Sequence, residues 1–181
     1  MNTVRFRISA GAMLLFALAY YFDSSGLFSA VVPAALAHEL GHIAALRLCA
    51  RRLTRIEISL TGVAMDYAPQ IEGVRAAVCI LSGPGSGLLY ALAAHSVGGA
   101  FWQMSGAASL LLSAFNLLPV LPLDGGRIVA LLLPERQTRM VSLAAALLIL
   151  GGGILLAIRY SAPVPVCMGA WLCLCNLRSA K

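Results

Sequence analysis

The chain has 181 residues and a net charge of +6, and 60% of its residues are apolar while only 11% are charged. A soluble domain usually carries about a quarter charged residues, so this composition excludes an ordinary soluble fold and indicates a membrane protein. The positive charge is explained by membrane topology, as shown below, and gives no reason to expect a nucleic-acid partner.

Long uncharged runs predict six membrane-spanning helices, because about 20 apolar residues are enough to cross a bilayer as a helix. Residues 76–123, 140–158 and 160–177 contain no Asp, Glu, Lys or Arg. The predicted spans, in chain order, are about Ile8–Phe22, Gly26–Leu46, Val74–His95, Phe101–Leu118, Met140–Ile158 and Pro163–Leu177. An alternative interpretation of the first span is a signal peptide, because basic residues precede its apolar stretch and Ala17-Leu18-Ala19 resembles a cleavage site.

The orientation of these spans follows from the distribution of basic residues. With the N-terminus in the cytosol, twelve of the thirteen Lys and Arg residues fall on the cytosolic side, and Arg159 alone falls outside. This bias matches the positive-inside rule. We therefore expect both termini in the cytosol, and the net charge needs no polyanionic partner.

A segment between the second and third predicted spans has the pattern of strands. Residues 55–61 alternate polar and apolar side chains, Gly62 follows, and Val63–Asp66 continues after it. Alternation with a glycine break predicts a short β-hairpin, although a surface strand without any role is an equal alternative. The expected fold class is an all-α polytopic membrane protein of about six transmembrane helices, with a short membrane-associated β-hairpin between the second and third. We expect a single domain over residues 1–181.

The second predicted span contains His38-Glu39-Leu40-Gly41-His42, which fits the pattern His-Glu-x-x-His. Four residues are slightly more than one helical turn, so both imidazoles point from one face and can share a metal ion. Glu39 lies about 100° around the helix from His38, where it is poorly placed as a ligand but able to act as a general base. Ionisable groups inside a bilayer are costly and usually functional, which favours a metal site over a buried polar cluster.

A catalytic zinc usually has three protein ligands and one open position, so one more ligand is needed. Glu39 is already used, Asp23 is expected on the outer side, and His95 at the far end of the third span. Asp124 remains, since the other acidic residues are expected in cytosolic loops: Glu57, Asp66, Glu72 and Glu135. At 1.5 Å per residue, His42 and His38 lie about 7 and 13 Å from the cytosolic end of their span, which matches the depth expected for Asp124.

The residues around Asp124 predict an irregular backbone at the inner end of the fourth span. Pro119 and Pro122 stop that helix, and Gly125 and Gly126 free the backbone after the aspartate. Such an unwound stretch is tolerated at membrane depth only where protein or a polar cavity covers it. The alternative is that Asp124 is a helix N-cap or a turn residue.

Together, these motifs resemble the site-2 protease family of intramembrane zinc metalloproteases, and within it the small bacterial stage IV sporulation proteases that process pro-sigma factors. The resemblance rests on the His-Glu-x-x-His segment and on residues 116–126, which are similar to the family pattern Asn-x-x-Pro…Leu-Asp-Gly. It implies that His38, His42 and Asp124 bind one Zn²⁺. It also implies that Glu39 activates water and that Asn116 helps to hold the substrate or the developing oxyanion.

The resemblance carries further expectations. They are a zinc metalloendopeptidase in a bacterial cell membrane, with its active site near the cytosolic face, and a membrane-tethered substrate such as a pro-sigma or anti-sigma factor. Regulatory membrane proteins are compatible partners. The segment around Ile56–Met65 would correspond to the family's hairpin, which is proposed to pair with extended substrate. Gly87 stands where the family usually has Asn, so a contact from that side chain is in doubt. Neither a PDZ nor a CBS domain is expected.

Two other functions are compatible with the histidine motif. A membrane metal-ion transporter needs ligands near the midplane and access from both faces, whereas here the polar residues crowd towards one face. A scaffold with a structural zinc usually needs four protein ligands, and the sequence offers no convincing fourth. Intramembrane proteolysis is therefore the predicted function.

Overall fold

The computed structural model describes residues 5–49, 52–59, 62–68 and 71–178. The chain divides into two compact units, Met1–Ala114 and Phe115–Lys181, which are described separately here. The elements of the first unit are β1 (Arg5–Ile8), α1 (Ala10–Tyr21), α2 (Leu27–Cys49), β2 (Arg52–Ser59), β3 (Gly62–Ala68), α3 (Gly73–Val97) and most of α4 (Ala100–Asn116). Those of the second unit are α5 (Asp124–Leu132), α6 (Glu135–Tyr160) and α7 (Val164–Arg178).

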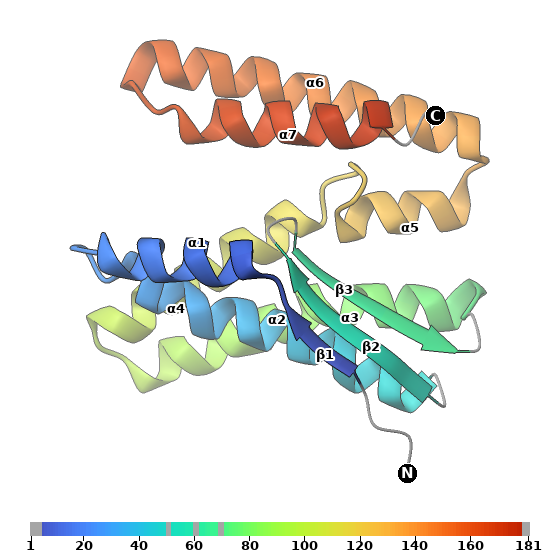
Figure 1. Ribbon diagram of the computed structural model, residues 1–181, viewed down its shortest axis with the longest axis horizontal. Helices are drawn as coiled ribbons and strands as arrows, with labels where there is room; N and C mark the ends of the chain where they lie inside the picture. The colour runs from blue at the N-terminus through green and yellow to red at the C-terminus, as the bar shows by residue number, and fades with distance from the viewer. Residues whose placement is uncertain (1–4, 50–51, 60–61, 69–70, 179–181) are drawn as a thin grey trace. The chain divides into compact units, whose positions relative to one another are not determined.

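The first unit contains a three-stranded sheet in the order β1-β2-β3 (Figure 1). Strand β2 pairs with β3 in antiparallel fashion over the segment for which a hairpin was predicted, and Leu60 and Thr61 lie outside the described residues. Strand β1 pairs with β2 in parallel, from Arg5 opposite Arg55 to Ile8 opposite Ile58. Because β2 is central, β3 is an edge strand of this sheet.

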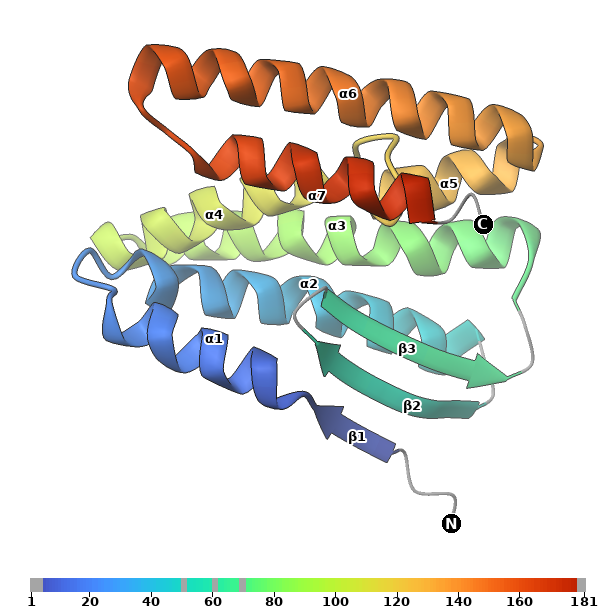
Figure 2. The same ribbon diagram turned by 45° about the horizontal axis from the view of Figure 1, so that its top comes forward.

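Helices α2 and α3 lie side by side in the first unit (Figures 1 and 2). Serine hydroxyls donate to backbone carbonyls across the helices, from Ser86 to Ala37 over 2.8 Å and from Ser105 on α4 to Ala30 over 2.7 Å. In a membrane, helices gain little from burying apolar surface against each other, so small residues and such hydrogen bonds hold them together. The sequence supplies both at the helix contacts.

Three helices, α2, α3 and α6, are long and apolar enough to cross a membrane, and they coincide with the second, third and fifth predicted spans. The other three predicted spans correspond to α1, α4 and α7, with 12, 17 and 15 residues. The first predicted span, Ile8–Phe22, is slightly shorter than expected, because Ile8 is the last residue of β1 and helix α1 begins at Ala10. The number of membrane crossings stays a prediction.

In the second unit, α6 and α7 lie side by side in both views (Figures 1 and 2). Their core includes Val120 from the segment before α5, Ala146 from α6 and Leu172 from α7, all fully buried. The segment that joins α4 to α5 therefore contributes to the core and is anchored there.

The structure corrects the expectation of an unwound backbone after Asp124, because Asp124 is the first residue of helix α5. The two glycines that follow Asp124 allow the start of α5 to pack closely against the preceding segment. A Cβ at Gly125 would lie 2.1 Å from the carbonyl oxygen of Leu117, and one at Gly126 would lie 2.4 Å from the carbonyl carbon of Val120. The first turn of α5 thus presses against the segment that precedes it, which only glycine permits.

Candidate metal centre

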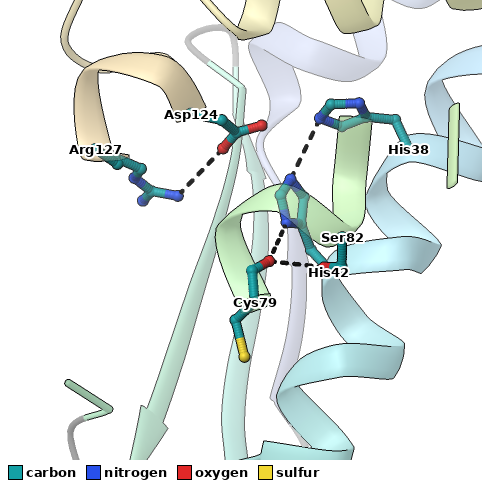
Figure 3. A network of polar contacts seen from close by, with 6 residues as sticks. All are labelled: His38, His42, Cys79, Ser82, Asp124 and Arg127. Carbon is teal, nitrogen blue, oxygen red and sulfur yellow. Dashed lines mark hydrogen bonds and ion pairs between the residues drawn. The ribbon is translucent and has the colours of Figure 1, made fainter. Parts of the chain in front are cut away.

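The two histidines of α2 face each other one helical turn apart. The Nε2 atoms of His38 and His42 are 3.2 Å apart, and the rings meet at 77° (Figure 3). Two nitrogen ligands about 2.0–2.1 Å from a tetrahedral zinc ion lie about 3.3 Å apart, so the observed separation suits a pair of ligands to one ion. The His38 side chain is deeply buried, with 4% of its surface exposed.

The backbone of α3 orients the His42 ring. Its Nδ1 lies 2.8 Å from the carbonyl oxygen of Cys79, which also accepts a 2.7 Å hydrogen bond from the Ser82 hydroxyl (Figure 3). A carbonyl can only accept, so Nδ1 carries the proton and Nε2 keeps its lone pair. Metal-bound histidines are commonly fixed in this way by a carbonyl or carboxylate on the other ring nitrogen. Sequence analysis missed this carbonyl, since a backbone acceptor leaves no residue signature.

Glycines let α2 and α3 approach closely enough for that contact. A Cβ at Gly83 would lie 2.1 Å from Nε2 of His42, and a Cβ at Gly41 would lie 2.3 Å from the backbone oxygen of Ser82. By contrast, a Cβ at Gly85 would meet no atom within 4 Å. The Gly-rich run 82–87 is typical of close helix packing, and Gly83 is the residue on which the His42 ring lies.

Gly87, the position at which the sequence resemblance leads one to expect Asn, lies against α4 and has no room for a side chain. A Cβ there would lie 2.2 Å from the Ser113 hydroxyl of α4, and the Ser109 hydroxyl donates to the Gly87 carbonyl over 2.8 Å. Ser113 is buried, with 7% of its surface exposed. The space of an Asn side chain is thus occupied by α4, and this position contributes no side-chain contact to a substrate.

In the second unit, Asp124 starts α5 and is buried, with 5% of its surface exposed. Its Oδ1 lies 3.9 Å from the guanidinium of Arg127, one turn later (Figure 3). The N-terminal end of a helix favours a negative charge, and so does a nearby guanidinium.

The remaining predicted residues have simple positions. Glu39 is half-buried in the middle of α2, and Asn116 is half-buried as the last residue of α4. His95, which was not expected to be a ligand, is exposed in the last turn of α3.

Residues 70–159 match the model of peptidase family M50. The fold is similar to the solved structure of the site-2 protease from Methanocaldococcus jannaschii, with a TM-score of 0.68. That match has 18% sequence identity and covers 93% of this chain and 86% of the other. No curated protein matches the sequence.

The family model and the similar fold together support a member of the site-2 protease family. The resemblance seen in the sequence is thereby confirmed at the level of the family and of the fold, which is an all-helical membrane fold with a small sheet. Members of this family are intramembrane proteases of the zinc metalloprotease type.

Proposed function

We propose that this site-2 protease hydrolyses a peptide bond in or near the transmembrane segment of a membrane-tethered protein. In this proposal one zinc ion is held by His38, His42 and Asp124. The observation that carries the proposal is the 3.2 Å separation of the two Nε2 atoms, with the His42 ring oriented through its other nitrogen by the Cys79 carbonyl.

The ligand chemistry supports a zinc site. Each of the three residues offers one ligand atom, an imidazole nitrogen or a carboxylate oxygen. Two histidines and one carboxylate form a common catalytic zinc set, which leaves a fourth position for water or substrate. Nothing in the sequence around Asp124 provides a competing third ligand, and the depth argument from the sequence places it level with the two histidines.

A zinc ion held there would polarise the scissile carbonyl and acidify a water molecule beside it. Glu39 takes the proton of the attacking water and passes it to the leaving amide nitrogen. Asn116 donates a hydrogen bond to the oxygen that becomes negatively charged in the transition state. Glu39 is on the same helix as both histidines, next to His38, which keeps the base close to the metal.

The substrate must present an extended backbone, because a helix hides its carbonyls in its own hydrogen bonds. Strand β3 is an edge of the sheet, and an unpaired edge accepts a further strand. We propose that a substrate segment adds to this edge before cleavage. Basic residues concentrate on one side of the predicted spans, which supports cytosolic termini and a site near the cytosolic face. The location that we propose, a bacterial cell membrane, rests on the resemblance to the bacterial proteases alone.

The test is co-expression with candidate tethered substrates, including pro-sigma and anti-sigma factors, followed by mapping of the cut. The Glu39→Gln variant keeps the shape of the side chain but removes the base. We expect it to bind zinc as the wild type does and to lose cleavage by at least about 100-fold. Full cleavage by this variant would refute the proposed mechanism.

A further inference from the structure

Two polar residues of the second unit, Ser142 on α6 and Asn176 on α7, hold both the backbone N–H and the backbone C=O of one residue in the segment before α5. The backbone N–H of Leu121 donates to the Ser142 hydroxyl over 2.7 Å, and the Leu121 carbonyl accepts from Asn176 Nδ2 over 2.9 Å. The Ser142 hydroxyl in turn donates to Asn176 Oδ1. Asn176 Nδ2 also donates to the Leu172 carbonyl over 2.8 Å.

This arrangement uses the hydrogen-bonding capacity of both side chains. The Ser142 hydroxyl accepts once and donates once, and the Asn176 amide accepts once and donates twice. The Ser142 side chain lies in the core, with 1% of its surface exposed. A closed network in such surroundings is rigid, because each bond lost would leave a buried polar group unsatisfied.

The network differs from ordinary contacts between membrane helices. A bond from Ser142 to Asn176 would suffice to join α6 to α7, yet both also bind the Leu121 backbone. A residue with both its N–H and its C=O captured has a fixed position and direction.

Leu121 lies three residues before Asp124, and the intervening chain has little freedom. The N–H of Leu123 donates to the Val120 carbonyl over 2.8 Å, and the N–H of Arg127 donates to the Leu123 carbonyl over 3.0 Å. The first turn of α5 also presses on the Val120 backbone through Gly126. A shift of Leu121 would therefore move Asp124.

From these contacts we infer that Ser142 and Asn176 are positioning residues for the metal centre, which hold Asp124 in place through the backbone N–H and C=O of Leu121. This inference rests on the proposed role of Asp124 as the third zinc ligand. In this proposal Ser142 and Asn176 act on the metal only through the position of Asp124. Their substitution is therefore expected to lower the zinc affinity, in addition to any effect on folding.

The test is a zinc titration of the purified full-length chain in detergent, in competition with a chromophoric chelator. Ser142→Ala and Asn176→Ala should each weaken zinc binding by about 10- to 100-fold, as the loss of outer contacts to metal ligands commonly does. Ser142→Thr keeps the hydroxyl and should bind zinc nearly as the wild type does. Asn176→Asp keeps the shape of Asn176 but cannot donate to Leu121, so it replaces Asn176→Ala if that variant does not fold.

Thr138 provides a matched control one turn before Ser142. It is buried on the same helix and donates to the Leu133 carbonyl over 3.2 Å, and in the described part of the chain it makes no hydrogen bond to Leu121. Thr138→Val removes only this hydroxyl bond, so it should alter thermal stability but leave the zinc affinity unchanged. Zinc binding that falls equally in Thr138→Val and Ser142→Ala would overturn the inference, because the loss would then reflect general destabilisation.

Asp124→Asn separates this inference from the proposed function. If Asp124→Asn weakens zinc binding while Ser142→Ala and Asn176→Ala bind as the wild type does, the positioning role is wrong and the ligand set stands. If Asp124→Asn itself binds zinc as tightly as the wild type, the ligand set is wrong and the positioning role is overturned with it.

Discussion

A methyl group added at Gly83 should displace the His42 ring. The new Cβ would lie 2.1 Å from Nε2 and 2.5 Å from Cε1, about as close to Nε2 as a zinc ion would lie. The ring cannot move away without lengthening the 2.8 Å contact between Nδ1 and the Cys79 carbonyl. Gly83→Ala therefore acts directly on a proposed ligand atom.

Gly85→Ala is the matched control, since it lies two residues later in α3 and its Cβ would meet no atom within 4 Å. Both substitutions gain about 1 kcal/mol of helix propensity, which cancels when the two variants are compared. Overpacking typically costs about 1–3 kcal/mol, so Gly83→Ala should be less stable than Gly85→Ala by about this amount. Its zinc affinity should fall by about 10- to 100-fold because the ring is displaced.

The assays are thermal unfolding in detergent and a zinc competition titration, run on both variants and on the wild type. Gly85→Ala should match the wild type in zinc affinity and equal or exceed it in stability. If Gly83→Ala binds zinc as tightly as Gly85→Ala, the close contact between α3 and His42 does not control the ligand geometry, and the reasoning fails.

Three further substitutions probe the packing and the ends of helices. Gly87→Asn should destabilise the chain by about 1–3 kcal/mol in thermal unfolding, because the Asn side chain overlaps Ser113. Adding Ser113→Gly to the same chain should recover part of this loss. Equal stability of the single and double variants would contradict the predicted overlap. Gly125→Ala puts a methyl group 2.1 Å from a backbone oxygen and should weaken zinc binding, measured by titration, whereas wild-type affinity would show that α5 can shift without harm. Hydrogen bonds lower the pKa of Asp23 below its ordinary value of 3.8, mainly the one from the Ser29 backbone N–H at the start of α2. The ionised Asp23 therefore stabilises the folded chain fully above pH 3.8, and this stabilisation is lost as the pH falls through the lowered pKa. The stability difference between wild type and Asp23→Ala, measured by unfolding from pH 6 downwards, should shrink as the pH falls, and a difference that does not change with pH would argue against a role for these hydrogen bonds.

The sequence predicts those features that depend on local spacing. The His38–His42 pair follows from the helical period, α3 and α6 follow from long uncharged runs, and α2 follows from a long apolar stretch around the histidine motif. Strand β1 could not be predicted, because four residues carry little pattern and its partner lies some 50 positions later. Helix α5 was missed because two glycines and two prolines argue against a helix, whereas close packing of those glycines on the preceding segment outweighs their low propensity.

The contacts that orient the site are equally non-local. The Cys79 carbonyl reaches His42 from another helix, and the Ser142–Asn176 bond joins residues 34 positions apart. Backbone acceptors and single serines have no sequence signature of their own. Among these contacts, the glycine-rich run 82–87 is the one with a local sequence pattern. This pattern is typical of close helix packing, but it does not identify the helix that packs there.

The central claim is that a metal ion bound by this chain cleaves a membrane-tethered protein. Its most direct test is cleavage of a tethered substrate, identified by co-expression, by the purified chain before and after zinc is removed with a chelator. We predict that the metal-free protein is inactive and that one equivalent of zinc per chain restores cleavage. Undiminished cleavage by the metal-free protein would contradict the account.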